Sequence, residues 1–135
     1  MLSVQTELVR VPAADGKYAV TWLGNAAGLL EGSALPGEGR AVIAGHNHLN
    51  TTEAGPFALL RDLETDDRIF VLTPSGELKT FSVYANQKIA EDDTAGLERI
   101  ANARDHSLTF ITCEDERPEG GYAARRIVAA AEIGE

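Results

Sequence analysis

The chain of 135 residues is about one domain long, and its 44% of hydrophobic residues can supply one core without disulfides or a structural metal. Its 12 basic and 21 acidic residues give a formal net charge of −9, which repels phosphate backbones and anionic headgroups and so argues against nucleic-acid and membrane-surface binding. The single cysteine, Cys113, excludes an internal disulfide and a zinc site built on several thiolates, and no apolar run approaches the ~20 residues of a membrane-spanning helix.

Short β-branched or aromatic segments between turn signals predict a strand-rich fold. The expected strands are residues 17–23, 40–44, 68–73, 78–84, 108–112 and 126–132, with a hairpin turn at Pro74-Ser75-Gly76. Only residues 56–62 and 94–102 have a helical pattern. Strands at this spacing with two short helices favour an all-β barrel or sandwich, which we expect to be a single domain over residues 1–135.

Cys113 directly follows the expected strand 108–112 and precedes the acidic segment 114–121, whose glycines and proline predict a loop. A lone cysteine can be a small buried hydrophobe, but a position at a strand end favours a nucleophile. Because a thiol with a pKa of about 8.5 is mostly protonated at neutral pH, a nucleophilic cysteine needs a proton acceptor or a cationic neighbour.

Three histidines are available as that acceptor. His46 and His48 follow an apolar strand that ends in Gly45, whereas His106 lies in a helix-to-strand connection where a solvated turn residue is expected. His46 and His48 share a strand face, yet a metal site there lacks a third ligand nearby. His46 is therefore a candidate partner for Cys113.

Arg125 and Arg126 begin the last expected strand, directly after the loop that leaves Cys113. Antiparallel pairing would return one of them beside the cysteine, where a fixed guanidinium could stabilise an oxyanion. Adjacent strand residues point to opposite faces, so only one of the two can lie on the cysteine face. An ordinary solvated basic patch is the alternative for this pair.

Three segments in this order resemble the sortases, the cysteine transpeptidases of Gram-positive cell surfaces. They are Ala44-Gly45-His46, Thr109-Phe110-Ile111-Thr112-Cys113 and Arg125-Arg126-Ile127-Val128-Ala129-Ala130, with Phe110 where the sortase signature has leucine. The resemblance implies the closed eight-stranded sortase β-barrel with one or two short helices. It also implies a catalytic set of His46, Cys113 and Arg125; an ungapped alignment of the last strand favours Arg125, and a shift of one residue would select Arg126 instead.

The resemblance further implies a substrate and a reaction. Cys113 would cleave a Leu-Pro-x-Thr-Gly-like sorting signal through a thioacyl enzyme, and an amine of a peptidoglycan precursor or a pilin would accept the acyl group. The residues expected to contact substrate are Ala44, Thr109, Ile111, Thr112, Glu114 and Ile127. Two alternatives stay open, a cysteine peptidase that acts mainly by hydrolysis and a non-catalytic β-barrel that binds peptides.

We expect no cofactor, because the acidic clusters 91–93 and 114–116 resemble a solvated surface more than a calcium site. The absence of a long insertion before His46 and of extra amino-terminal helices favours a compact enzyme of class A, D or E. Sortases carry a membrane anchor, so we expect a monomeric catalytic domain at the extracellular face of the membrane, anchored by a segment outside this chain. Trp22 and Phe57 are expected in the core rather than in contact with substrate.

Overall fold

The computed structural model describes residues 8–11, 13–14, 17–18, 27–30, 33–36, 38–46, 57, 60–73, 76–90, 92–102, 106–116 and 122–133. These residues form mainly strands. In chain order the elements are β1 (Leu8–Val11), β2 (Ala13–Ala14), β3 (Lys17–Tyr18), β4 (Ala27–Leu30), β5 (Ala41–Ala44), η2 (Leu60–Asp62), β6 (Arg68–Leu72), β7 (Leu78–Ala90), α1 (Thr94–Ala101), β8 (Ser107–Glu116) and β9 (Tyr122–Glu132).

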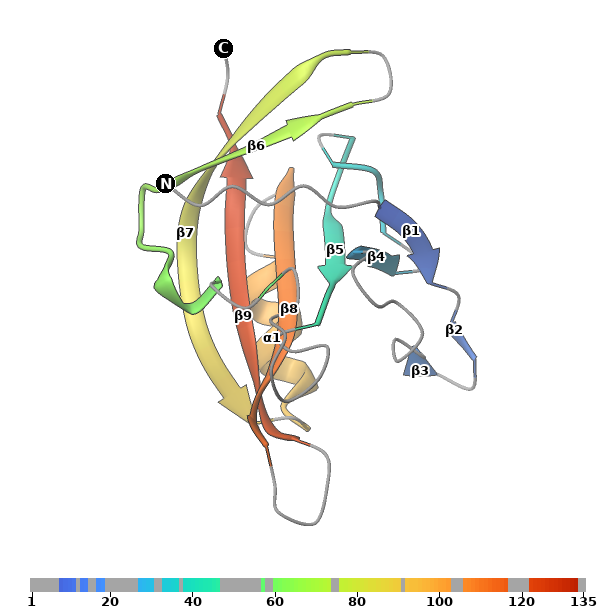
Figure 1. Ribbon diagram of the computed structural model, residues 1–135, viewed down its shortest axis with the longest axis vertical. Helices are drawn as coiled ribbons and strands as arrows, with labels where there is room; N and C mark the ends of the chain where they lie inside the picture. The colour runs from blue at the N-terminus through green and yellow to red at the C-terminus, as the bar shows by residue number, and fades with distance from the viewer. Residues whose placement is uncertain are drawn as a thin grey trace.

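Seven of the strands form one curled sheet in the order β1-β4-β5-β8-β9-β7-β6, and β2 pairs with β3 separately (Figure 1). The β1–β4 and β5–β8 pairs are parallel, and the other neighbours in this sheet are antiparallel. The expected all-β class is confirmed. The closed eight-stranded barrel is not seen in the described part of the chain, because β1 and β6 each pair on one side only and leave an open, half-barrel sheet.

The strands β7 and β9 are longer than the sequence pattern predicts. β7 continues six residues past the expected end at Tyr84, and β9 begins four residues before Arg126. The alanine-rich last segment is strand because it pairs on both sides, with β7 and with β8. The helix at 94–102 is confirmed as α1, whereas the described residues within 56–62, which are 57 and 60–62, include only the short 3-10 helix η2.

The β6–β7 hairpin closes as predicted around residues 73–77. The Thr73 N–H donates to the Glu77 carbonyl at 2.9 Å, and Gly76 has a φ of 89°, a left-handed conformation that glycine adopts without strain. The hairpin projects from the sheet and exposes three large apolar side chains, Phe70, Leu72 and Leu78. Trp22 and most of the strand expected at 17–23 lie outside the described residues.

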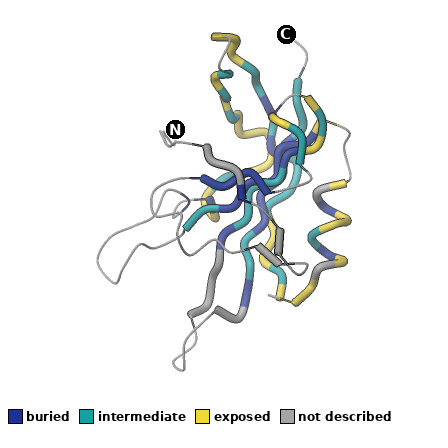
Figure 2. Tube along the Cα trace, turned by 90° about the vertical axis from the view of Figure 1, so that its right-hand side faces the viewer, coloured by how far each residue is buried: buried dark blue, intermediate teal, exposed yellow. Residues whose placement is uncertain are grey.

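The sheet is apolar on both faces, and Figure 2 shows its central strands as the buried part of the molecule. The larger core fills the inside of the curl and includes Ala41, Ile43, Phe57, Leu60, Phe81, Val83, Leu108, Val128 and Ala130. On the opposite face, α1 packs through Ile100 and Leu97 against Ile127 and Ala129. Phe57 is 5% exposed, which confirms its expected place in the core.

A β-bulge in β7 adapts the sheet to α1. The β7–β9 register passes from Val83 opposite Ala130 to Ala85 opposite Ala129, so Tyr84 is the extra residue. The Tyr84 hydroxyl donates to the Ile100 carbonyl at 2.7 Å near the end of α1. The bulge therefore supplies a polar anchor for the helix.

A second polar anchor lies inside the curl and holds η2. The Asn86 amide nitrogen on β7 lies 3.2 Å, 3.3 Å and 2.7 Å from the carbonyl oxygens of Leu60, Arg61 and Leu63. The Arg126 guanidinium on β9 donates to Asn86 Oδ1 at 3.0 Å and so fixes the orientation of the amide. This Arg126–Asn86 clamp joins two strands to the segment that carries η2.

Candidate active site

The register of β5 and β8 brings His46 to the level of Cys113. The two strands are parallel, and Ala44 pairs with Ile111. The Gly45 N–H then donates to the Ile111 carbonyl at 3.1 Å, which carries the ladder one residue beyond β5. His46 lies two residues past Ala44 and Cys113 two residues past Ile111, so the two positions are neighbours on adjacent strands.

The register of β8 and β9 adds an arginine to this row. Cys113 pairs with Arg125, and Thr112 pairs with Arg126. Positions that oppose each other in an antiparallel pair lie on the same face of a sheet. Positions 46, 113 and 125 therefore form one row across β8, β9 and the residues that follow β5.

Arg125 and Arg126 lie on opposite faces, as neighbours on a strand must. Arg126 belongs to the clamp inside the curl, where its guanidinium donates to Asn86. Both arginines are half-buried. The register therefore puts Arg125 on the Cys113 face and gives Arg126 a structural contact on the other face.

The expectation that a loop begins after Cys113 is wrong. β8 continues to Glu116, with Glu114 opposite Ala124 and Glu116 opposite Tyr122. The acidic residues are compatible with strand here because the β5 ladder has ended at Gly45, so that β9 alone continues to pair with β8. Cys113 thus lies within a two-stranded extension of the sheet rather than at a strand end.

The other residues expected to contact substrate are distributed over both faces. Ala44, Ile111 and Ile127 occupy the row next to that of Cys113; Ile111 is half-buried, whereas Ala44 and Ile127 are 9% and 0% exposed. Thr109 and Thr112 are 0% and 3% exposed, and neither hydroxyl has a hydrogen-bond partner among the described residues. Thr112 lies on the face of Arg126, away from the Cys113 row.

Phe57 contacts the backbone that carries His46, a relation that the sequence pattern does not indicate. Its N–H donates to the His46 carbonyl at 3.0 Å, and its ring lies over Gly45. The ring also packs edge-to-face against Phe110, with centroids 5.2 Å apart. A proline and an aromatic residue soon after the histidine are the available signal, but their pattern predicts a helix and a core residue rather than a contact with the site.

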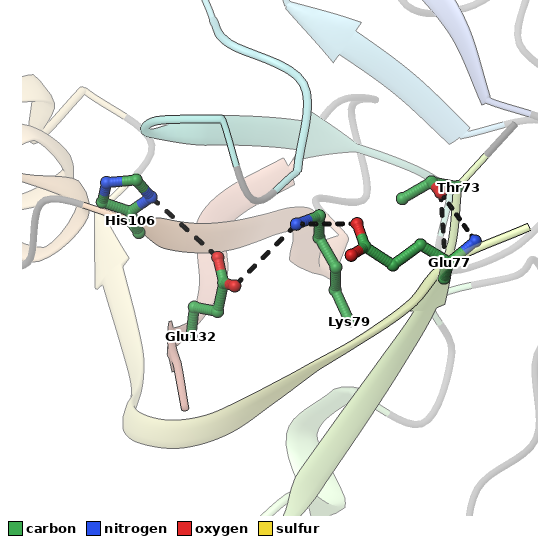
Figure 3. Close-up of polar contacts among 5 residues, drawn as sticks. All are labelled: Thr73, Glu77, Lys79, His106 and Glu132. Carbon is green, nitrogen blue, oxygen red and sulfur yellow. Dashed lines mark hydrogen bonds and ion pairs between the residues drawn. The ribbon is translucent and has the colours of Figure 1, made fainter. Parts of the chain in front are cut away.

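His106 lies at the opposite end of β8 and is exposed, as expected. It lies seven positions before Cys113, or roughly 23 Å away at the ~3.3 Å rise of a strand. Figure 3 shows His106 in a series of ionisable side chains, with its Nδ1 3.9 Å from Glu132 Oε1. Lys79 Nζ lies 4.0 Å from Glu132 Oε2 and 3.2 Å from Glu77 Oε1. The hydrogen bond with Glu77 raises the pKa of Lys79 above its usual 10.5.

The acidic clusters give no ligand set that the structure can define. Asp93 caps α1, where its Oδ1 accepts a hydrogen bond from the Gly96 N–H at 2.9 Å, and Glu91 lies outside the described residues. Within the described ranges, no group of three or more His, Cys, Asp or Glu side chains could hold a metal ion. Neither does any helix in those ranges combine the length and apolarity needed to cross a bilayer.

Comparison with known proteins identifies the framework that carries this row. A sortase-domain sequence model matches residues 3–133. Among solved structures, sortase A from Corynebacterium diphtheriae is 32% identical with a TM-score of 0.62, over 81% of this chain and 48% of that chain. Sortase C-1 from Actinomyces oris is 25% identical with a TM-score of 0.60, over 81% of this chain and 59% of that chain.

The fold is also similar to sortase A from Listeria monocytogenes, at 18% identity and a TM-score of 0.65 over 97% of this chain and 81% of that one. A search of curated proteins found no match. The chain spans 48% to 59% of the length of the Corynebacterium and Actinomyces sortases. Because the family match extends over nearly the whole sequence and these two solved sortases have a similar fold over 81% of the chain, the chain belongs to the sortase family.

Proposed function

We propose that this chain is the catalytic part of a sortase, a cysteine transpeptidase that cleaves a Leu-Pro-x-Thr-Gly-like sorting signal and transfers it to an amine. The observation that carries the proposal is the row of positions 46, 113 and 125 across β8, β9 and the residues that follow β5. A nucleophile, a proton donor and a fixed cation within one row are the groups that acyl transfer through a thioester requires.

In the first half of the reaction, the Cys113 thiolate attacks the threonine carbonyl carbon of the signal and forms a C–S bond. Arg125 and the Glu114 N–H donate hydrogen bonds to the oxyanion or to neighbouring peptide carbonyls. The tetrahedral intermediate collapses, the Thr–Gly C–N bond breaks, and the His46 imidazolium gives its proton to the departing amine. The product of this half is a thioacyl enzyme.

In the second half, an amine of a peptidoglycan precursor or a pilin attacks the thioester carbon. The new C–N bond forms, the C–S bond breaks, and His46 accepts the proton that the attacking amine loses, which regenerates the thiolate and the imidazolium. Water in place of the amine gives hydrolysis, so a peptidase activity is the expected side reaction. No metal ion is needed for either half.

The sorting-signal peptide would lie over the row of Ala44, Ile111 and Ile127, which is next to the row of positions 46, 113 and 125. Ile111 contacts two apolar clusters, one with Ala44 and Leu30 and one with Ile127 and the helix α1. Its half-buried side chain, with Ala44 beside it, offers a small apolar floor for the Leu-Pro part of the signal. Contacts of Thr109 and Thr112 with substrate remain predictions that would require these buried side chains to become accessible.

The family also supports an extracellular, membrane-anchored enzyme, and we propose that the catalytic unit acts as a monomer. The sorting-signal variant and the amine acceptor define the class to which it belongs, and a compact class A, D or E enzyme is our proposal. Calcium is not required in this scheme.

The test is a ligation assay with quenched Leu-Pro-x-Thr-Gly peptides, with and without a glycine-oligomer amine. Wild type is expected to give an amine-dependent product that Cys113→Ala loses. Amine-independent cleavage would instead indicate a peptidase, and the absence of turnover and of any thioacyl adduct would refute both. Arg125→Ala and Arg126→Ala separate the arginines: the first is expected to reduce kcat by about 10²-fold or more, and a loss confined to Arg126→Ala would overturn the assignment.

A further inference from the structure

We propose that Phe57 is a positioning residue for His46: it sets where the imidazole stands by holding the His46 backbone and by pressing against Gly45. This inference rests on the proposed role of His46 as the proton donor and acceptor. It concerns a residue outside the catalytic row and a contact that lies entirely within the described part of the chain.

The backbone at Gly45 and His46 is fixed by two hydrogen bonds that run in different directions. The preceding Gly45 N–H donates to the Ile111 carbonyl at 3.1 Å, which ties this point of the chain to β8. The His46 carbonyl accepts from the Phe57 N–H at 3.0 Å, which ties it to the segment that leads into η2. Phe57 therefore supplies the restraint on His46 that β5 no longer supplies beyond Ala44.

The Phe57 ring limits the space next to His46. A Cβ atom at position 45 would lie only 2.6 Å from Phe57 Cδ2 and 2.7 Å from Cε2. Among the described glycines, left-handed φ angles occur at Gly39 and Gly76 and not at Gly45. The glycine before His46 is therefore required by contact with the ring and not by backbone conformation.

Phe57 can restrain the position of Gly45 and His46 because contacts on its ring and on its backbone fix Phe57 itself. Its ring is 5% exposed and packs edge-to-face on Phe110, at an interplanar angle of 79°. Its carbonyl accepts from the Leu60 N–H at 3.3 Å, and the carbonyls of η2 are held by the Arg126–Asn86 clamp. A continuous set of contacts thus runs from Arg126, next to the catalytic arginine in sequence, to the backbone of the catalytic histidine.

A positioning role predicts a specific kinetic signature. Displacing the imidazole slows proton transfer to the leaving amine, but it leaves the peptide-binding surface of β8 unchanged. A misplacement of about 1 Å can cost up to about 10²-fold in rate. Gly45→Ala, which forces the ring and the backbone apart, should therefore lower kcat about 10-fold or more with KM within about 2-fold, and should distort the His46-dependent limb of the pH profile.

An exchange of side-chain size between positions 45 and 57 tests whether contact with the Phe57 ring causes the loss of kcat in Gly45→Ala. Phe57→Leu removes Cε2 and replaces the rigid ring with a branched side chain, whose methyl groups can rotate away from the methyl group that Gly45→Ala introduces. It leaves the Phe57 N–H in place. The double variant Gly45→Ala/Phe57→Leu should recover kcat to the level of Phe57→Leu alone. Phe70→Leu is the matched control, since Phe70 is 53% exposed on the hairpin, and it should match wild type.

The readout that separates this inference from the proposed function is an NMR titration of the His46 imidazole in each variant, with His46→Gln used for assignment. We expect the His46 ring shifts to move in Gly45→Ala and to return in the double variant. Unmoved shifts, or a double variant whose loss equals the product of the two single losses, would overturn the inference. If wild type ligates no peptide while the shifts follow the size exchange, the proposed function fails and the positioning of His46 by Phe57 stands.

Discussion

The substitution Asn86→Asp isolates the clamp that holds η2. Aspartate keeps the shape of asparagine and the Oδ1 acceptor for Arg126, but it replaces the NH₂ group, which faces the carbonyls of Leu60, Arg61 and Leu63 at 3.2 Å, 3.3 Å and 2.7 Å and has two hydrogens to donate. Two hydrogen bonds are lost at about 0.5–1.5 kcal/mol each, and the carbonyls left without a donor add about 1–3 kcal/mol of desolvation cost. A stronger pair with Arg126 offsets part of this.

We therefore expect Asn86→Asp to lower the free energy of unfolding by about 2–4 kcal/mol, a large part of the ~5–15 kcal/mol of a typical domain. Urea unfolding followed by circular dichroism measures this value, with an unchanged m-value showing that the same surface is exposed. Hydrogen exchange adds a local reading, because the Leu63 N–H donates to the Leu60 carbonyl at 3.1 Å and should lose protection.

Gln87→Glu is the control for this experiment. It makes the same change from amide to carboxylate on the next residue of β7, where the side chain is exposed. Its cost should stay within about 0.5 kcal/mol, as for most surface substitutions. The reasoning is refuted if Asn86→Asp costs no more than Gln87→Glu, since net charge alone would then account for the effect.

Three further predictions concern stability. Tyr84→Phe removes the hydroxyl that bonds Ile100 at 2.7 Å and should cost about 1–2 kcal/mol in urea unfolding; an unchanged midpoint would mean that the helix is anchored by packing alone. Leu108→Ala should cost about 2–5 kcal/mol, because this 0% exposed side chain is flanked by alanines on both adjacent strands and the cavity cannot be refilled; a smaller loss would indicate that the sheet collapses. The raised pKa of Lys79 means that its pairing with Glu77 stabilises the fold fully below pH 10.5 and is lost as pH rises through the higher folded-state value, so melting temperatures of wild type and Lys79→Met should converge in strong alkali and not below that pH.

The positions of the main strands could be predicted because their apolar patterns are local. β5, β6 and the start of β7 contain β-branched and aromatic residues between clear turn signals, and the structure confirms them. The four-residue strands β1 and β4 were missed, since β1 is a strand through its parallel pairing with β4, and β4 through its pairing with both β1 and β5, which no local pattern encodes. Short strands of this kind exist only through their partners.

The extension of β8 beyond Cys113 shows the same limit at the candidate site. Its residues Glu114–Glu116 have a loop-like composition, and only the partner strand β9 makes them a ladder. The face shared by Cys113 and Arg125 could be argued from the two-residue period of strands, but the pairing register that puts 113 opposite 125 depends on the length of the connection between them. The contact of Phe57 with His46 is a tertiary contact, and no periodic pattern in the sequence indicates it.

The extra residue at Tyr84 decides which face of the sheet receives Asn86. In an unbroken ladder that starts with Val83 opposite Ala130, Asn86 would lie opposite Ile127, on the candidate substrate face. Because Tyr84 is the extra residue of the bulge, Asn86 lies opposite Val128 instead, on the face of Arg126. Deletion of Tyr84 would leave that later pairing in place and remove only the helix anchor. Insertion of one more residue beside Tyr84 would move the side chains of the rest of β7 to the opposite face of the sheet, unless the bulge became one residue larger. At this point β7 can therefore lose one residue and with it the hydrogen bond to α1, whereas an added residue would disrupt the Arg126–Asn86 clamp.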